Sequence, residues 1–179
     1  IKENIENVNA KIEAACQRSG RKREDVLLLA VSKTIDVPRI KEAVACGLTE
    51  LGENKVQEIM DKYEPMGSGV KWHLIGHLQT NKVKYIIDKV DLIHSVDSYS
   101  LIKEIEKQAN KHNLVMKVLI QVNIAKEESK HGFKVEEIEE VFDTLKNYPH
   151  IEVKGLMMMA PNIEAEKTRE YFKLTQDLF

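Results

Sequence analysis

The chain has 179 residues, of which 42% are hydrophobic and 31% are charged, and its formal net charge is −2. This length fits one domain, and the apolar share is enough for a packed core, which excludes a disordered chain. The charge balance argues against nucleic-acid binding, and no apolar run approaches the roughly 18 residues of a membrane span. The two cysteines, Cys16 and Cys46, form no CxxC motif. We therefore expect neither a disulfide framework nor a zinc site, and a reducing cytoplasm.

The first segment has apolar residues at spacings of three and four, which predicts an amphipathic helix that ends near Ser19-Gly20. The apolar positions of this helix are Ile5, Val8, Ile12 and Cys16. The next segment, Val26–Val31, is a continuous apolar run. Continuous hydrophobicity is typical of a strand that is covered on both faces, as in parallel sheets.

Five more predicted strands follow, and each is separated from the next by a segment with helical periodicity. The strands are expected at 49–52, 71–75, 92–96, 117–124 and 153–159. The helices are expected around Ile40, Ile59, Ile86, Ile105, Val141 and Phe172. Asp36 and Pro38 favour the start of the first of these helices, and Pro65 is expected to stop the second.

Strict alternation of strands and helices predicts an α/β fold with a parallel sheet. No glycine-rich phosphate loop follows the first strand, so a TIM-type (β/α)8 barrel is favoured over a dinucleotide-binding sheet. The strands recur about every 25 residues, so eight units need roughly 230 residues, near the usual barrel size. We therefore expect residues 1–179 to form a single barrel domain that is incomplete at its C-terminus. It would hold about six β/α units after the first helix, with open edges at the first and sixth strands.

Polar residues gather where the strands end, which is where a barrel places its chemistry. Lys33 follows six apolar residues, and a semi-buried amine there could form a Schiff base with an aldehyde. The alternative is that Lys33 only extends into solvent. Asn54 is either a helix cap or a hydrogen-bond donor to a ligand. The histidines show no HExxH or other metal-binding spacing, so no metal site is expected.

The strings at the strand ends are more specific together than any one residue. They are AVSKT at 30–34, GENKVQE at 52–58, WHLIGHLQTNK at 72–82, HSVD at 94–97, QVN at 121–123, KHG at 130–132 and GLMMMAP at 155–161. In this order they resemble the YggS-type pyridoxal phosphate homeostasis family, over essentially the whole chain. The resemblance implies a fold like the N-terminal barrel domain of alanine racemase.

The resemblance also implies a cofactor, pyridoxal 5′-phosphate (PLP), held as a Schiff base on Lys33. Asn54 matches the position beside the cofactor ring, and Lys130 matches a loop lysine that takes part in cofactor transfer. Four further residues match positions that line the barrel mouth: His73, Gly76, Ser95 and Met157. The family continues with a Ser-Met-Gly-Met-Ser string for the phosphate and a Val-Arg-Ile-Gly-Thr string for the ring nitrogen, and neither occurs in these 179 residues.

The family role implied is intracellular buffering and delivery of PLP without catalytic turnover, in the cytoplasm, with PLP-dependent apo-enzymes as partners. The full-length family form is expected to be a monomer, whereas the shorter chain is expected to associate through open strand edges. Two alternatives stay open. One is an enzyme, either a racemase-like PLP protein or a Schiff-base aldolase that uses Lys33, although an alanine racemase needs a second, β-rich domain. The other is an interaction module that binds no cofactor.

Overall fold

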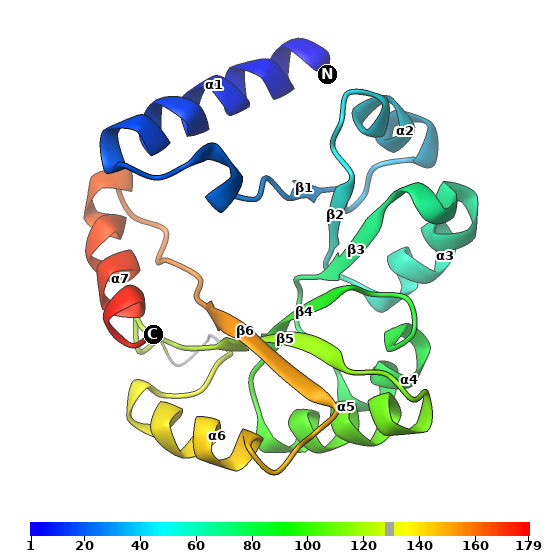
Figure 1. The fold of residues 1–179 in the computed structure, drawn as a ribbon, viewed down its shortest axis with the longest axis vertical. Helices are drawn as coiled ribbons and strands as arrows, with labels where there is room; N and C mark the ends of the chain where they lie inside the picture. Colours follow the sequence, from blue (N-terminus) through cyan, green and yellow to red (C-terminus); the bar gives the residue numbers. More distant parts are fainter. Residues whose placement is uncertain (128–130) are drawn as a thin grey trace.

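The computed structural model describes residues 1–127 and 131–179 and contains one parallel sheet of six strands in the order β1-β2-β3-β4-β5-β6. The strands are β1 Ala30–Val31, β2 Glu50–Glu53, β3 Lys71–Leu74, β4 Leu92–Val96, β5 Met116–Gln121 and β6 Ile151–Met157. The helices are α1 Lys2–Ser19, α2 Val37–Ala45, α3 Val56–Met66, α4 Val83–Ile86, α5 Tyr99–Lys111, α6 Ile138–Leu145 and α7 Ala165–Asp177. Figure 1 shows the helices around the outside of the curved sheet, which confirms the predicted alternation and barrel-like fold class.

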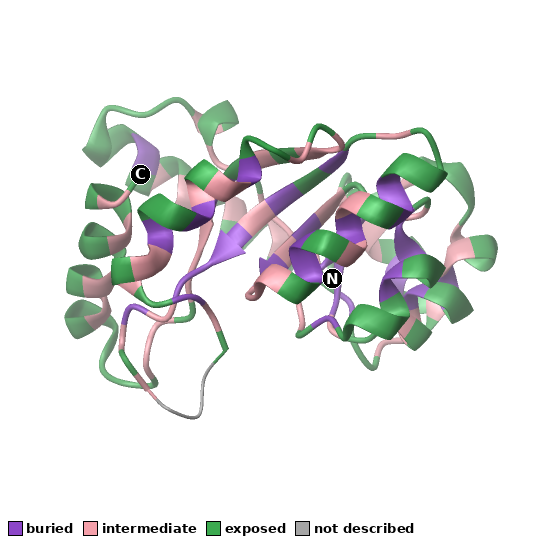
Figure 2. Ribbon diagram, turned by 90° about the horizontal axis from the view of Figure 1, so that it is seen from below, coloured by how far each residue is buried: buried purple, intermediate pink, exposed green. Residues whose placement is uncertain are grey.

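The core lies between the sheet and the helices. Figure 2 shows buried positions on the strands and on the inner helix faces, with exposed positions outside. Helix α5 contributes most, since Leu101, Ile102 and Ile105 are at most 1% exposed. Its N-cap is Ser98, whose Oγ accepts a hydrogen bond from the Leu101 N–H. By contrast, α7, which is described in full, has no buried residue.

The first strand is shorter than its apolar run predicts. Only Ala30 and Val31 pair with β2, and Leu27 and Val31 are 62% and 51% exposed. Among the described residues β1 has one strand neighbour and pairs with it through Ala30 and Val31 alone. The prediction of a strand over Val26–Val31 was therefore too long, because an apolar run reports which side chains avoid water and not how many residues pair with a neighbouring strand.

Two other boundaries differ from the predictions for local reasons. Pro65 does not stop α3, which ends one residue later at Met66, before Gly67 with φ 69°. A proline in the last turn gives up a single hydrogen bond, and glycine supplies the turn. Strand β5 ends at Gln121 instead of 124, because Phe133 folds back and its N–H donates to the Gln121 carbonyl at 2.8 Å.

Candidate functional site

Lys33 lies just beyond the carboxyl end of β1, in the turn between β1 and α2. A Cβ on Gly52 would lie 3.1 Å from Leu29 and 3.2 Å from Ile75, so these residues of three neighbouring segments face one another. Val31 lies two positions from Leu29 and shares its face. Lys33 lies in the turn after β1, which is closed by a hydrogen bond from the Ile35 N–H to the Ser32 carbonyl at 3.1 Å. Lys33 is exposed, and within the described residues no hydrogen bond or ion pair engages its amine. The amine is therefore available for chemistry.

A buried ion network lies behind Lys33, on the opposite face of the chain. Lys62 from α3 donates to the Ser32 carbonyl and to Glu53 Oε1, both at 2.8 Å, and to Glu58 Oε2 at 3.0 Å. Ser32 Oγ donates to the same Glu53 oxygen at 2.7 Å. Glu53 is fully buried and the Lys62 side chain is 9% exposed. The network therefore anchors the residue before Lys33 to β2 and α3.

The same network holds the residue after Lys33. The Thr34 N–H donates to Glu58 Oε2 at 2.7 Å, and Thr34 has φ 62°, in the left-handed region. A non-glycine residue adopts that backbone at a cost, and the hydrogen bond to a carboxylate offsets it. The backbone on both sides of Lys33 is thus fixed by Glu58 and Lys62, which position the exposed amine without touching it.

The charges of the network are set by burial and by the hydrogen bonds. Burial alone would lower the pKa of Lys62, but hydrogen bonds to Glu53 and Glu58 outweigh it and raise that pKa. The backbone hydrogen bond from Thr34, with Lys62 beside it, lowers the pKa of Glu58. Burial raises the pKa of Glu53, whose Oε2 has no hydrogen-bond partner among the described residues.

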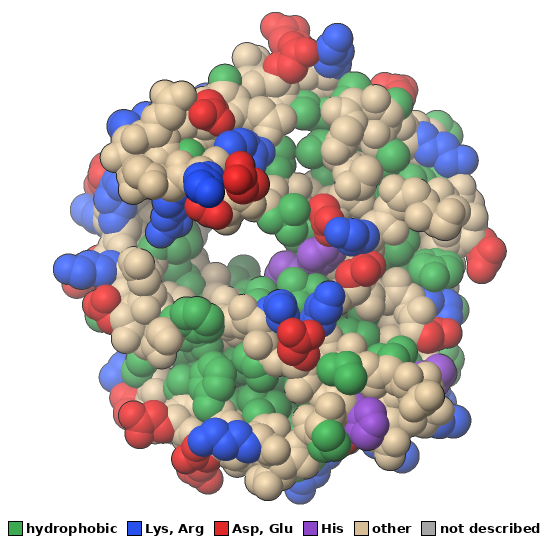
Figure 3. All heavy atoms as spheres, viewed as in Figure 1, with side chains coloured by type: hydrophobic (Ala, Val, Ile, Leu, Met, Phe, Trp, Pro, Cys, Tyr) green, Lys and Arg blue, Asp and Glu red, His purple; other side chains and the backbone are tan. Residues whose placement is uncertain are grey.

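A second polar cluster fills the interior surface of the sheet. His73 Nε2 lies 2.7 Å from Glu50 Oε2, and His73 Nδ1 lies 2.8 Å from His94 Nε2. With neutral rings, His73 donates to the carboxylate and accepts from His94. Figure 3 shows histidine side chains beside an opening near the centre of the molecule. Because both ring nitrogens of His73 are engaged, its predicted role beside a ligand is limited to contact through the ring.

The pKa values of His94 and Glu50 are both lowered, but for different reasons. Burial, followed by repulsion from His73, lowers the pKa of His94 from 6.5 to about 4. Burial would raise the pKa of Glu50, but hydrogen bonds from His73 and Lys71 outweigh it and lower that pKa. Glu50 therefore stays ionised and His94 stays neutral near neutral pH.

This cluster makes the fold sensitive to mild acid. Unfolded histidine takes up a proton near 6.5 and folded His94 only near about 4, so the unfolded chain binds more protons between these values. The free energy of unfolding therefore falls as the pH falls through this window. We expect the urea midpoint of the parent to fall between pH 7 and pH 4.5. The fall should be smaller in His94→Gln, whose amide can still donate to His73. An identical pH dependence in parent and variant would contradict this assignment.

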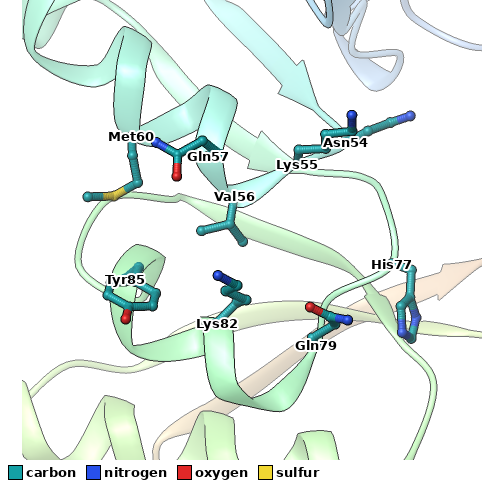
Figure 4. Close-up of a pocket in the computed structure, with 9 residues that line it drawn as sticks. All are labelled: Asn54, Lys55, Val56, Gln57, Met60, His77, Gln79, Lys82 and Tyr85. Carbon is teal, nitrogen blue, oxygen red and sulfur yellow. The ribbon is translucent and has the colours of Figure 1, made fainter.

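Asn54 and Gly76 lie against each other at the carboxyl end of the sheet. A Cβ on Gly76 would lie 2.7 Å from the Asn54 Cα, so the loops after β2 and β3 touch through backbone alone. Half-buried Asn54 lies at one end of a pocket of about 600 Å³, near His77, with Met60 and Tyr85 at the other end (Figure 4). The pocket is lined by Asn54, Lys55, Val56, Gln57, Met60, His77, Gln79, Lys82 and Tyr85.

Gly76→Ala should separate these two loops. The added methyl group meets backbone atoms, which cannot move away as a flexible side chain could. We expect the free energy of unfolding to fall by about 1–3 kcal/mol, the usual cost of overpacking. Urea denaturation measures it, and Gly69→Ala is the control, because a Cβ on Gly69 has no described neighbour within 4 Å. Equal urea midpoints for both variants would contradict the close approach.

The remaining predicted site residues are less closely connected. Ser95 is fully buried on β4, and its Oγ has no hydrogen-bond partner within the described part of the chain. Half-buried Met157 ends β6, and its carbonyl accepts from the Val122 N–H at 2.9 Å. Lys130 lies outside the described residues. The structure thus places Lys33 in the turn after β1 and brings Asn54 against Gly76. The ligand contacts of all seven residues stay predictions.

Sequence reasoning missed the residues that position Lys33 and those that hold His73. Glu58 and Lys62 are four apart on a predicted helix, a spacing that usually marks a surface ion pair. That spacing was the only available signal of the network, and it did not reveal the buried Glu53. Glu50 and His94 gave no signal, because their contacts with His73 cross from strand to strand.

The chain was compared with known families, proteins and structures. Residues 4–179 match the family described as "Alanine racemase, N-terminal domain". A pyridoxal phosphate homeostasis protein of Aquifex aeolicus is 44% identical over 98% of this chain and 78% of its own length. The Escherichia coli K12 protein of that name is 37% identical over 96% of this chain and 74% of its own length.

A solved structure extends the comparison. PipY of Synechococcus elongatus, with PLP bound, has a TM-score of 0.80 and 29% identity, covering 95% of this chain and 79% of that one. The same protein without PLP has a TM-score of 0.83. Together with the strand-end strings and the exposed Lys33 amine, these matches show that the chain belongs to the pyridoxal phosphate homeostasis protein family, whose fold is that of the alanine racemase N-terminal domain.

Proposed function

We propose that this chain binds pyridoxal 5′-phosphate through Lys33 and serves to hold and deliver the cofactor without turning over a substrate. The observation that carries the proposal is the placement of Lys33. Its side chain is exposed just beyond the carboxyl end of β1, and the backbone on both sides is held by the Lys62 network. PipY, a relative with this fold, has been solved with PLP bound.

The residues at the carboxyl ends of the strands fit the aldehyde end of this cofactor. When bound, PLP supplies an aldehyde, which condenses with a primary amine, and Lys33 offers that amine without a competing partner among the described residues. The buried Ser95 Oγ, which lacks a described partner, and the Asn54 amide at the mouth are polar groups that a bound cofactor can engage.

Several observations favour a carrier over an enzyme. A PLP enzyme needs a positioned acid or base near the reacting carbon. The His73 ring has both nitrogens committed, to Glu50 and His94. The matched relatives from Aquifex aeolicus and Escherichia coli are named homeostasis proteins. The alanine racemase fold keeps a racemase-like activity as the second candidate.

The partners and setting of this function also belong to the proposal. The receiving partners would be PLP-dependent apo-enzymes. The full-length family form would act as a monomer, whereas this shorter chain would associate through its open strand edges. No helix in the described ranges is long and apolar enough to cross a membrane. Both cysteines are free thiols, which is in keeping with the proposed cytoplasmic setting.

Cofactor transfer and turnover can be measured on the same sample. The chain is loaded with PLP, freed of excess cofactor, and mixed with an apo-aminotransferase whose activity reports the cofactor it receives. We expect activity to appear in proportion to the loaded chain, and no racemised or deaminated product when amino acids are added to the loaded chain alone. Steady product formation without the apo-enzyme would contradict the carrier function and support a racemase-like enzyme. Failure of the chain to retain any PLP would contradict both functions.

A further inference from the structure

Three potential metal ligands converge at the carboxyl end of the sheet, apart from the Lys33 network. His77 follows β3, Asp97 follows β4 and His131 precedes α6. Each of the two histidines directs Nδ1 at the same carboxylate oxygen: His77 lies 3.0 Å and His131 3.6 Å from Asp97 Oδ2. One ligand atom from each of the three residues lies within 4.8 Å of the others.

The spacing of these atoms suits a tetrahedral ion. Zinc bonds to nitrogen and oxygen ligands at about 2.1 Å, which separates neighbouring ligand atoms by roughly 3.4 Å. The two measured separations, 3.0 and 3.6 Å, lie on either side of that value. Two imidazoles and one carboxylate, with one position left for water or another ligand, form a common donor set for zinc. Imidazole is a ligand that Zn²⁺, Ni²⁺ and Cu²⁺ share, whereas Mg²⁺ and Ca²⁺ prefer oxygen.

The arrangement of the rings shows what an ion would have to change. The His77 and His131 rings are stacked, with centroids 3.9 Å apart and planes 13° from parallel. Because the lone pair of an imidazole nitrogen lies in the ring plane, one ring has to turn out of this stack for both Nδ1 atoms to bind one ion. The Asp97 side chain is 7% exposed, whereas His77 and His131 are 44% and 58% exposed. The carboxylate is thus held in place by its surroundings while an ion can reach the histidines from solvent.

We propose that His77, Asp97 and His131 form a binding site for a divalent transition-metal ion, with zinc as the favoured ion. The ion would replace the two contacts to Asp97 by three metal–ligand bonds. It would also tie the loops after β3 and β4 to His131. This revises the expectation that the chain has no metal site, which relied on spacing along the sequence. The inference is independent of PLP binding.

The experiment measures zinc binding to the whole chain without PLP. All samples carry Cys46→Ser, because the exposed Cys46 thiol can bind zinc by itself. Equilibrium dialysis followed by elemental analysis gives the stoichiometry, and competition with a chromophoric chelator gives the affinity. The variants are Asp97→Asn and the double variant His77→Ala/His131→Ala. His112→Ala is the matched control, since His112 is an exposed histidine outside the cluster.

We expect one zinc ion per chain in the parent and in His112→Ala. In the two site variants the affinity should fall by at least about 100-fold, since losing only an outer-shell partner of a metal ligand costs 10–100-fold. Zinc should also raise the Tm of the parent and not that of the variants, because it binds only the folded site. Co²⁺ should give the visible absorption of a tetrahedral N/O complex. A parent that binds no zinc, or site variants that bind it as tightly as His112→Ala, would overturn the proposal.

Discussion

Replacing Lys33 by alanine should abolish the covalent PLP adduct that borohydride traps on the parent chain. Trapping needs a primary amine that is exposed to the cofactor and free of competing partners, which is the setting of Lys33 among the described residues. The parent should gain the mass of one reduced cofactor, and Lys33→Ala should gain none. The absorbance of the Schiff base, recorded before reduction, should be present in the parent and missing in Lys33→Ala.

Matched lysine controls make this result specific. Lys55 and Lys82 are exposed and line the pocket beside Asn54. Lys55→Ala and Lys82→Ala therefore test whether another nearby amine forms the trapped adduct. We expect both controls to be trapped like the parent. The Lys33 amine makes no hydrogen bond or ion pair in the described structure, so Lys33→Ala should melt with the parent. A Lys33→Ala chain that still gains one cofactor would remove Lys33 from its proposed role.

The second large effect concerns stability. Lys62→Met should lower the free energy of unfolding by about 3–5 kcal/mol, the usual loss when one partner of a buried ion pair is removed. The change leaves fully buried Glu53 without its counter-ion and the Ser32 carbonyl without its donor. Urea denaturation at pH 7 measures the loss. Lys146→Met is the surface control, because Lys146 and Asp143 are 76% and 73% exposed, and its midpoint should stay close to that of the parent.

A second substitution separates charge from packing. Adding Glu53→Gln to Lys62→Met removes the buried charge that would otherwise stay unpaired, so part of the lost stability should return. Both variants should bind PLP less tightly than the parent, because the backbone beside Lys33 is no longer held. If Lys62→Met had the same urea midpoint as Lys146→Met, the network would not stabilise the fold as its geometry requires.

The sequence predicted the order and type of the elements because the hydrophobic periodicity is strong. The ends of β4, at Leu92 and Val96, agree with the prediction, and Gly20 ends α1 with φ 70° as a left-handed cap. The prediction was wrong for the first strand, where the apolar run overstates the pairing. Periodicity reports which face is apolar, whereas the length of a strand depends on the neighbours that bond to it.

The site was only partly predictable. Lys33 and Asn54 were singled out at strand ends, and the structure places both at the carboxyl end of the sheet. The ion network behind Lys33 joins positions up to 30 residues apart, from Ser32 to Lys62, and the His77–His131 stack joins two loops. No spacing rule covers such contacts, because they arise only when parallel strands bring their ends to one edge.

The most direct test of the central claim is a peptide map of the parent chain after PLP binding and borohydride reduction. The account predicts a single reduced cofactor per chain, located by tandem mass spectrometry on Lys33 in the peptide that contains Ser32 and Thr34. Limiting amounts of PLP should label this lysine first, ahead of the exposed lysines Lys55 and Lys82. A cofactor spread over several surface lysines, or located on one other than Lys33, would contradict the account.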